Sequence, residues 1–134
     1  MISPDLCTDD EIATLVHAFY AEVRQDDLIG PIFNEHVDDW DEHLARLVDF
    51  WSSIMRGTGR YSGTPMQIHV ALPELKPEFF QRWLALFEQT LNQQPNQAMS
   101  ERALPAAKRI AQSLWYAYQM NRHPGTLPTD LPVA

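Results

Sequence analysis

The chain has 134 residues, with ten Lys and Arg against eighteen Asp and Glu, and a formal net charge of −8. This acidic balance argues against nucleic-acid binding, which needs a basic face to neutralise phosphates, and against a basic helix that binds anionic membranes. No stretch approaches the roughly 18 apolar residues of a membrane span, and the start lacks the pattern of a signal peptide. Because 45% of the residues are apolar and Cys7 is the only cysteine, we expect one disulfide-free cytoplasmic domain over residues 1–134.

The first predicted helix begins near Thr8, because Thr8 and Glu11 form a T-x-x-E capping box. Apolar side chains then recur at helical spacing through Ile12, Leu15, Val16, Phe19, Tyr20 and Val23. The pattern predicts that this helix ends in a turn over residues 27–31, where Gly30 precedes Pro31.

A second long helix is predicted from Asp38 or Asp39, either of which can cap it, to Gly57, a natural helix stop. Its apolar stripe comprises Trp40, Leu44, Leu47, Val48, Trp51, Ile54 and Met55. A Gly-rich loop follows, without the Gly-Lys-Ser/Thr ending of a phosphate loop. Pro65 in a first helical position then predicts a short helix over residues 65–70.

Two more long helices complete the prediction. Pro77 opens one of them, and the other runs from about Ser100 or Leu104 to Asn121. The Pro-rich tail over 122–134 cannot continue a helix and is expected to be a loose terminus. No segment predicts a strand. We therefore expect an all-α fold, either a plain bundle or a two-over-two sandwich around a flat ligand.

Histidines are the candidate ligands and acid–base groups, and the chain has five: His17, His36, His43, His69 and His123. The sequence contains neither the H-E-x-x-H zinc pair nor the G-x-S-x-G nucleophile elbow. His43 falls at the edge of the second apolar stripe, where a histidine is more often a hydrogen-bonded boundary residue. His69 lies among apolar neighbours in the predicted short helix, as an axial haem ligand would. The spacing of the residues around His69 fits a partly buried histidine in a loop equally well.

Seven ordered blocks of the sequence resemble the truncated haemoglobins of the third group. They are FYAEVR (19–24), LIGPIFN (28–34), WDEHL (40–44), FWSSIM (50–55), GTGRYSGTPM (57–66), HVALP (69–73) and FFQRWLALF (79–87). The match covers about residues 8–121, with short gaps, and leaves only the termini outside. It implies a globin core over that range, folded as a two-over-two sandwich around haem b.

The resemblance also implies a role for each matching residue. His69 matches the proximal histidine that binds the haem iron, and Phe33 matches the phenylalanine that packs on the haem. Tyr20, His43 and Trp83 match the polar side chains of the distal pocket, where His43 swings toward the ligand or away from it. Leu47 would form a wall of the distal pocket. The candidate partners of the haem propionates are Arg46, Arg60 and Tyr61.

These roles imply reversible binding of O2, NO or CO. Tyr20 and Trp83 would each donate a hydrogen bond to the ligand, worth roughly 1.5–3 kcal/mol, which suits NO detoxification or peroxidase-like chemistry. The sequence contains no reductase domain, so turnover needs an external electron donor. Passive O2 binding without turnover, as in oxygen transport, or sensing is the alternative, and a haem-free helical interaction module is a third hypothesis. The sequence does not distinguish a monomer from a dimer. It also does not identify the sixth ligand of the ferric iron, for which the candidates are water, hydroxide, His43 and Tyr20.

Overall fold

A computed structural model describes residues 6–59 and 75–131, and every regular element in these two ranges is a helix. In chain order the helices are α1 (Asp9–Gln25), α2 (Gly30–His36), α3 (Trp40–Arg56), α5 (Pro77–Asn92) and α6 (Gln97–Arg122). The predicted all-α fold is confirmed. Among these helices of the described ranges, none is long and apolar enough to cross a membrane. The short helix predicted over residues 65–70 lies outside the described residues.

Local capping sets the start of α1 and both ends of α3. The Thr8 N–H donates to Glu11 Oε1 at 2.9 Å, and the Glu11 N–H donates to Thr8 Oγ1 at 3.1 Å. Asp39 Oδ1 accepts the Glu42 N–H at 3.2 Å, and Gly57 ends α3 in the left-handed region with φ of 70°. These contacts satisfy backbone groups that a helix end leaves without an intrahelical partner.

The sequence prediction missed α2 and assigned its first residues to a turn. Gly30 and Pro31 instead occupy its first two positions, where the missing proline N–H breaks no helical hydrogen bond. Seven residues are too few for helical periodicity to register. A side chain at Gly30 is not tolerated, because a Cβ there would lie 2.9 Å from the Arg24 carbonyl oxygen and 3.0 Å from that of Val23. The start of α2 therefore packs directly against the end of α1.

The predicted start of α6 was also wrong, because the helix begins at Gln97 instead of near Ser100 or Leu104. The Asn96 side chain caps it by accepting the Met99 N–H at 3.0 Å. The predicted start lay close to Pro105, but Pro105 lies inside the helix. The cap therefore decides where α6 begins.

The tail that was expected to be loose folds back onto α6. Gln119 Nε2 donates to the Thr129 carbonyl oxygen at 2.8 Å, and Gln119 Oε1 accepts the Thr129 N–H at 3.1 Å. The Leu131 N–H donates to Gln112 Oε1 at 3.1 Å, and the Leu131 side chain packs on a buried cluster of α5 and α6. Amide side chains of α6 thus provide hydrogen-bond partners for the backbone of the tail, which forms no regular structure of its own.

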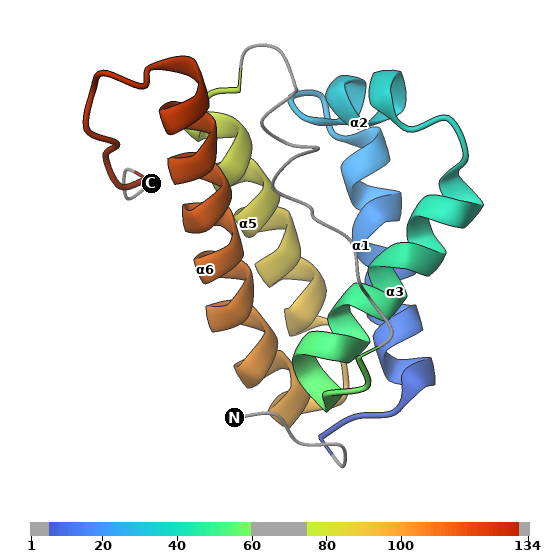
Figure 1. Cartoon of the computed structure of the whole chain (residues 1–134). Helices are drawn as coiled ribbons and strands as arrows, with labels where there is room; N and C mark the ends of the chain where they lie inside the picture. Colours follow the sequence, from blue (N-terminus) through green and yellow to red (C-terminus); the bar gives the residue numbers. More distant parts are fainter. Residues whose placement is uncertain (1–5, 60–74, 132–134) are drawn as a thin grey trace.

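The helices form two pairs that meet in an aromatic core. Figure 1 shows α5 and α6 side by side and antiparallel, α1 crossing α3, and α2 at one end of the molecule. The Phe87 ring stacks on Trp83 at 5.6 Å and on Trp51 at 5.1 Å, and Phe19 meets Phe87 edge-on at 4.9 Å. These contacts join α1, α3 and α5 in one core. The arrangement is the two-over-two sandwich that the resemblance implies.

Candidate functional site

A cavity of about 470 Å³ lies between α2, α3, α5 and α6, within the ~300–1,000 Å³ range of cofactor pockets. Most of its wall is apolar and comprises Ile29, Ile32, Phe33, Val37, Leu47, Phe50, Trp51, Leu75, Phe79, Phe80, Ile110, Ala111 and Leu114. Eight polar or charged side chains complete the lining: Tyr20, His43 and Trp83, which are buried or partly buried, and His36, Asp38, Asp39, Glu42 and Arg46, which are exposed. An apolar cavity with a few convergent polar groups is the usual form of a ligand or cofactor site.

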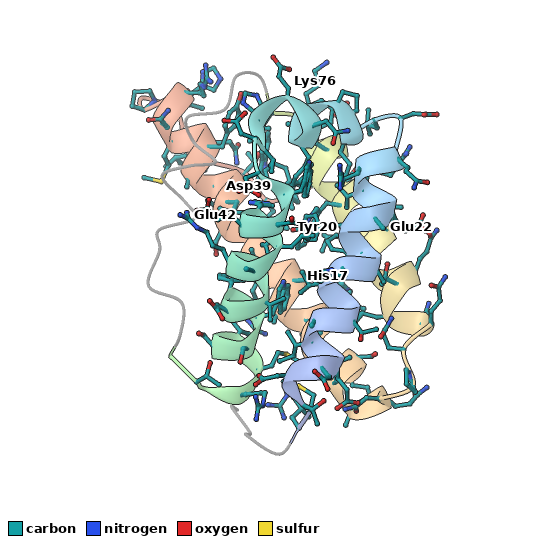
Figure 2. The ribbon with its side chains drawn as sticks, turned by 90° about the vertical axis from the view of Figure 1, so that its right-hand side faces the viewer. His17, Tyr20, Glu22, Asp39, Glu42 and Lys76 are labelled. Carbon is teal, nitrogen blue, oxygen red and sulfur yellow. The ribbon has the colours of Figure 1, made fainter. Side chains whose placement is uncertain are left out.

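Tyr20 of α1 and Trp83 of α5 meet in one wall of this cavity. Their side chains are hydrogen-bonded to each other, and because an indole N–H can only donate, the Tyr20 oxygen is the acceptor. The Tyr20 O–H therefore stays available as a donor. Tyr20 is 4% exposed, and Figure 2 shows it between α1 and α3. Burial raises the pKa of Tyr20 to about 12, against the opposing effect of the Trp83 hydrogen bond.

His43 lies beside Tyr20 and lines the same cavity. Its ring meets the Tyr20 ring edge-on at 6.1 Å and the Trp40 ring edge-on at 5.4 Å. The Arg24 guanidinium covers Trp40 at 4.5 Å from the ring centre. His43, predicted at the edge of an apolar stripe, is therefore held among aromatic rings on the cavity side of α3.

The mouth of the cavity is acidic. Asp38, Asp39 and Glu42 line it, and Figure 2 shows Asp39 and Glu42 at the start of α3. Arg46 also lines the mouth, but its Nη2 pairs with Glu42 Oε1 at 2.7 Å, and both side chains are more than half exposed. The arginine that the resemblance assigns to a haem propionate thus already has a carboxylate partner.

The structure brings most of the sequence-predicted site residues to this one cavity. Six of them, from four different helices, line it: Tyr20, Phe33, His43, Arg46, Leu47 and Trp83. The other three lie outside the described residues: Arg60, Tyr61 and His69. Four aromatic and aliphatic lining residues were not predicted as site residues: Phe50, Phe79, Ile110 and Leu114. Helical spacing marks such residues as inward-facing, but it does not distinguish a filled core from a cavity.

A sequence model of the bacterial-like globin family matches residues 5–115. The chain belongs to this family. It is 40% identical over 116 residues to a group 3 truncated haemoglobin of Campylobacter jejuni, across 81% of this chain and 91% of that protein. Its fold is similar to the crystal structure of a group III truncated haemoglobin from Campylobacter jejuni, with a TM-score of 0.77 and 36% identity over 93% of this chain and 99% of that one. The resemblance to the third group of truncated haemoglobins is confirmed.

Membership of the globin family implies that the chain binds haem, with small diatomic gases as ligands. The described cavity fits such a cofactor. Its apolar walls, with Phe33 and Leu47 among them, suit the faces of a flat macrocycle, and Tyr20 and Trp83 give one wall hydrogen-bonding atoms. The guanidinium of Arg46 lies at the mouth, where the charged edge of a haem can stay close to water.

Proposed function

We propose that this globin binds a b-type haem whose iron is held by His69, and that it binds O2, NO and CO reversibly on the side of Tyr20. The observation that carries this proposal is the buried Tyr20 hydroxyl in the wall of an apolar cavity. Because its oxygen accepts from Trp83, its O–H is left to donate to a ligand. The role of His69 rests on the match to the family's proximal histidine.

When bound, the haem would supply the iron that binds the gas and the electron-transfer chemistry of the reaction. The contribution of the chain is electrostatic. Tyr20 donates its O–H to a ligand that carries partial negative charge, inside walls of Leu47 and Phe50 that exclude water. Trp83 restricts the orientation of the Tyr20 hydroxyl before the ligand arrives, so little reorganisation is needed.

We propose ligand chemistry, either NO detoxification or peroxidase-like turnover, in preference to passive oxygen transport or sensing. A buried donor slows ligand release, because affinity differences between related complexes lie mostly in the dissociation rate. Slow release suits a reaction on the bound gas better than its delivery. Turnover needs a supply of electrons, so a reductase is the class of partner that this function requires.

Absorption spectra of the purified protein, reconstituted with haem, test the binding function. We expect a histidine-ligated, five-coordinate ferrous form that takes CO and converts to a stable O2 adduct. A protein that stays folded and ignores added haem would contradict the proposal and favour a haem-free interaction module. Consumption of NO and of peroxide, each measured with a reductant, tests catalysis. Rates no higher than those of free haem would leave passive binding as the function.

The raised pKa of Tyr20 predicts a flat pH profile for O2 release. We expect the O2 dissociation rate to stay constant between about pH 7 and 10, where an ordinary tyrosine begins to ionise. Because the pKa of Tyr20 is raised to about 12, its donor proton is lost only near that pH, and the rate then rises. Stopped-flow measurements in buffers of increasing pH check this. A rise centred near pH 10 would mean that the phenol has its ordinary, solvated pKa.

Glu42→Gln is expected to slow haem loss. The substitution removes the carboxylate that pairs with Arg46 at 2.7 Å, which frees the guanidinium for a haem propionate. Because both side chains are exposed, we expect the substitution to strengthen haem binding by no more than about 1 kcal/mol, which corresponds to roughly fivefold slower haem loss. The measurement is haem transfer to an excess of a scavenging protein. Asp41→Asn, which removes a carboxylate of the same turn outside the cavity lining, is the control. Faster haem loss from Glu42→Gln would show that the ion pair supports the pocket.

A further inference from the structure

Asp26 joins the end of α1 to two neighbouring helices. Its side chain is 8% exposed, and its Oδ2 accepts the N–H groups of Leu28 and Ile29 at 3.0 Å each. Its Oδ1 accepts from Arg82 Nη1 of α5 at 2.7 Å. One partly buried carboxylate therefore caps the turn into α2 and forms an ion pair with α5.

The charge on this carboxylate is stabilised by the groups around it. Burial alone would raise the pKa of Asp26, but the Ile29 N–H, the Arg82 guanidinium and the Leu28 N–H together lower it below its usual value. Asp26 is thus ionised at neutral pH. Because the Asp26 side chain is 8% exposed and that of Arg82 is 43% exposed, loss of this pair should cost more than loss of a fully exposed one.

The ion pair spans the same two helices as the Tyr20–Trp83 hydrogen bond. Asp26 follows directly after α1, which carries Tyr20, and Arg82 directly precedes Trp83 on α5. Phe19 of α1 also meets the Trp83 ring edge-on, at 5.3 Å. A shift of α5 along α1 would therefore change the ion pair and the hydrogen bond together.

We propose that Asp26 and Arg82 are a positioning pair, which holds α5 against α1 so that Trp83 stays bonded to the Tyr20 hydroxyl and O2 release is slow. This inference rests on the proposed function, in which Tyr20 donates to the gas. Neither Asp26 nor Arg82 lines the cavity. The pair acts only through the two aromatic residues.

Arg82→Gln tests the pair, because the side chain of Arg82 is 43% exposed and its replacement leaves the hydrophobic core intact. In the haem-loaded protein we expect O2 dissociation to become about 3- to 10-fold faster, less than the loss of the Tyr20 bond itself. The C–O stretching frequency of the CO form should shift in the direction that Tyr20→Phe produces. Arg82→Lys keeps the charge, so its O2 dissociation rate and its C–O stretching frequency should lie closer to those of the parent protein. The control Arg56→Gln breaks an ion pair between α3 and the start of α1 and should change neither.

The decisive comparison uses the Tyr20→Phe background, in which Arg82→Gln should add no further increase in O2 dissociation. An equal increase in that background, or an unchanged rate in the single variant, would overturn the positioning role. Asp26→Asn gives a second test, since its amide oxygen can still cap the turn while the charge is lost, and it should act as Arg82→Gln does. If Tyr20→Phe alone leaves O2 dissociation unchanged, the proposed function itself fails. If only Arg82→Gln and Asp26→Asn have no effect, the positioning role alone fails.

Discussion

His69→Ala is expected to abolish stable haem binding while most of the helical fold survives. Substituting residues that merely orient a metal ligand already costs 10–100-fold in affinity, so loss of the ligand itself should speed haem loss by more than about 100-fold. The stack of Trp51, Phe87 and Trp83 packs protein against protein and does not require His69. Haem titration and transfer to a scavenger measure the first effect, and circular dichroism of the apoprotein measures the second.

Two comparisons make the His69 result specific. His17, an exposed histidine of α1, provides the control, because His17→Ala should bind haem as the parent protein does. Added imidazole should restore a five-coordinate ferrous spectrum to His69→Ala by occupying the vacated ligand position. Unchanged haem affinity in His69→Ala would remove this residue as the axial ligand.

Tyr20→Phe is expected to give the largest change in ligand kinetics. The substitution removes the buried O–H donor and keeps the aromatic ring, so the cavity changes little in shape. A hydrogen bond to a ligand with partial charge is worth roughly 1.5–3 kcal/mol, which corresponds to about 10- to 150-fold faster O2 dissociation. Stopped-flow measurement of O2 release checks this. Tyr116→Phe is the control, because that hydroxyl contacts Asp130 in the tail, away from the cavity.

Trp83→Phe is also expected to speed O2 release, but through Tyr20. In the structure the Trp83 side chain is bonded to Tyr20, and its loss leaves the phenol free to turn away from the ligand. The double variant should therefore release O2 no faster than Tyr20→Phe alone. Fully multiplicative effects would instead identify Trp83 as a second, independent donor to the ligand. No change in either single variant would mean that the distal donors lie elsewhere.

Contacts between near neighbours in the chain could be predicted from the sequence. The box of Thr8 and Glu11, the cap at Asp39 and the stop at Gly57 were all confirmed, because each joins groups within a few residues. The helix α2 was missed since it is too short to show a period and starts with a Gly-Pro pair that is equally typical of turns. The contacts of the tail could not be predicted, because its hydrogen bonds depend on side chains of α6.

For the site, the residue types and, through the resemblance, the family and the candidate residues could all be predicted from the sequence. How these residues combine depends on the packing of the helices. It directs Trp83 to the Tyr20 oxygen, and it joins Asp26 to Arg82 across 56 residues of chain. The pairing of Arg46 with Glu42 spans a single helical turn, yet it bears on function only because both line the cavity mouth. The physical reason is that capping and periodicity act within a turn or two, whereas a cavity and its hydrogen bonds exist only after distant helices have packed.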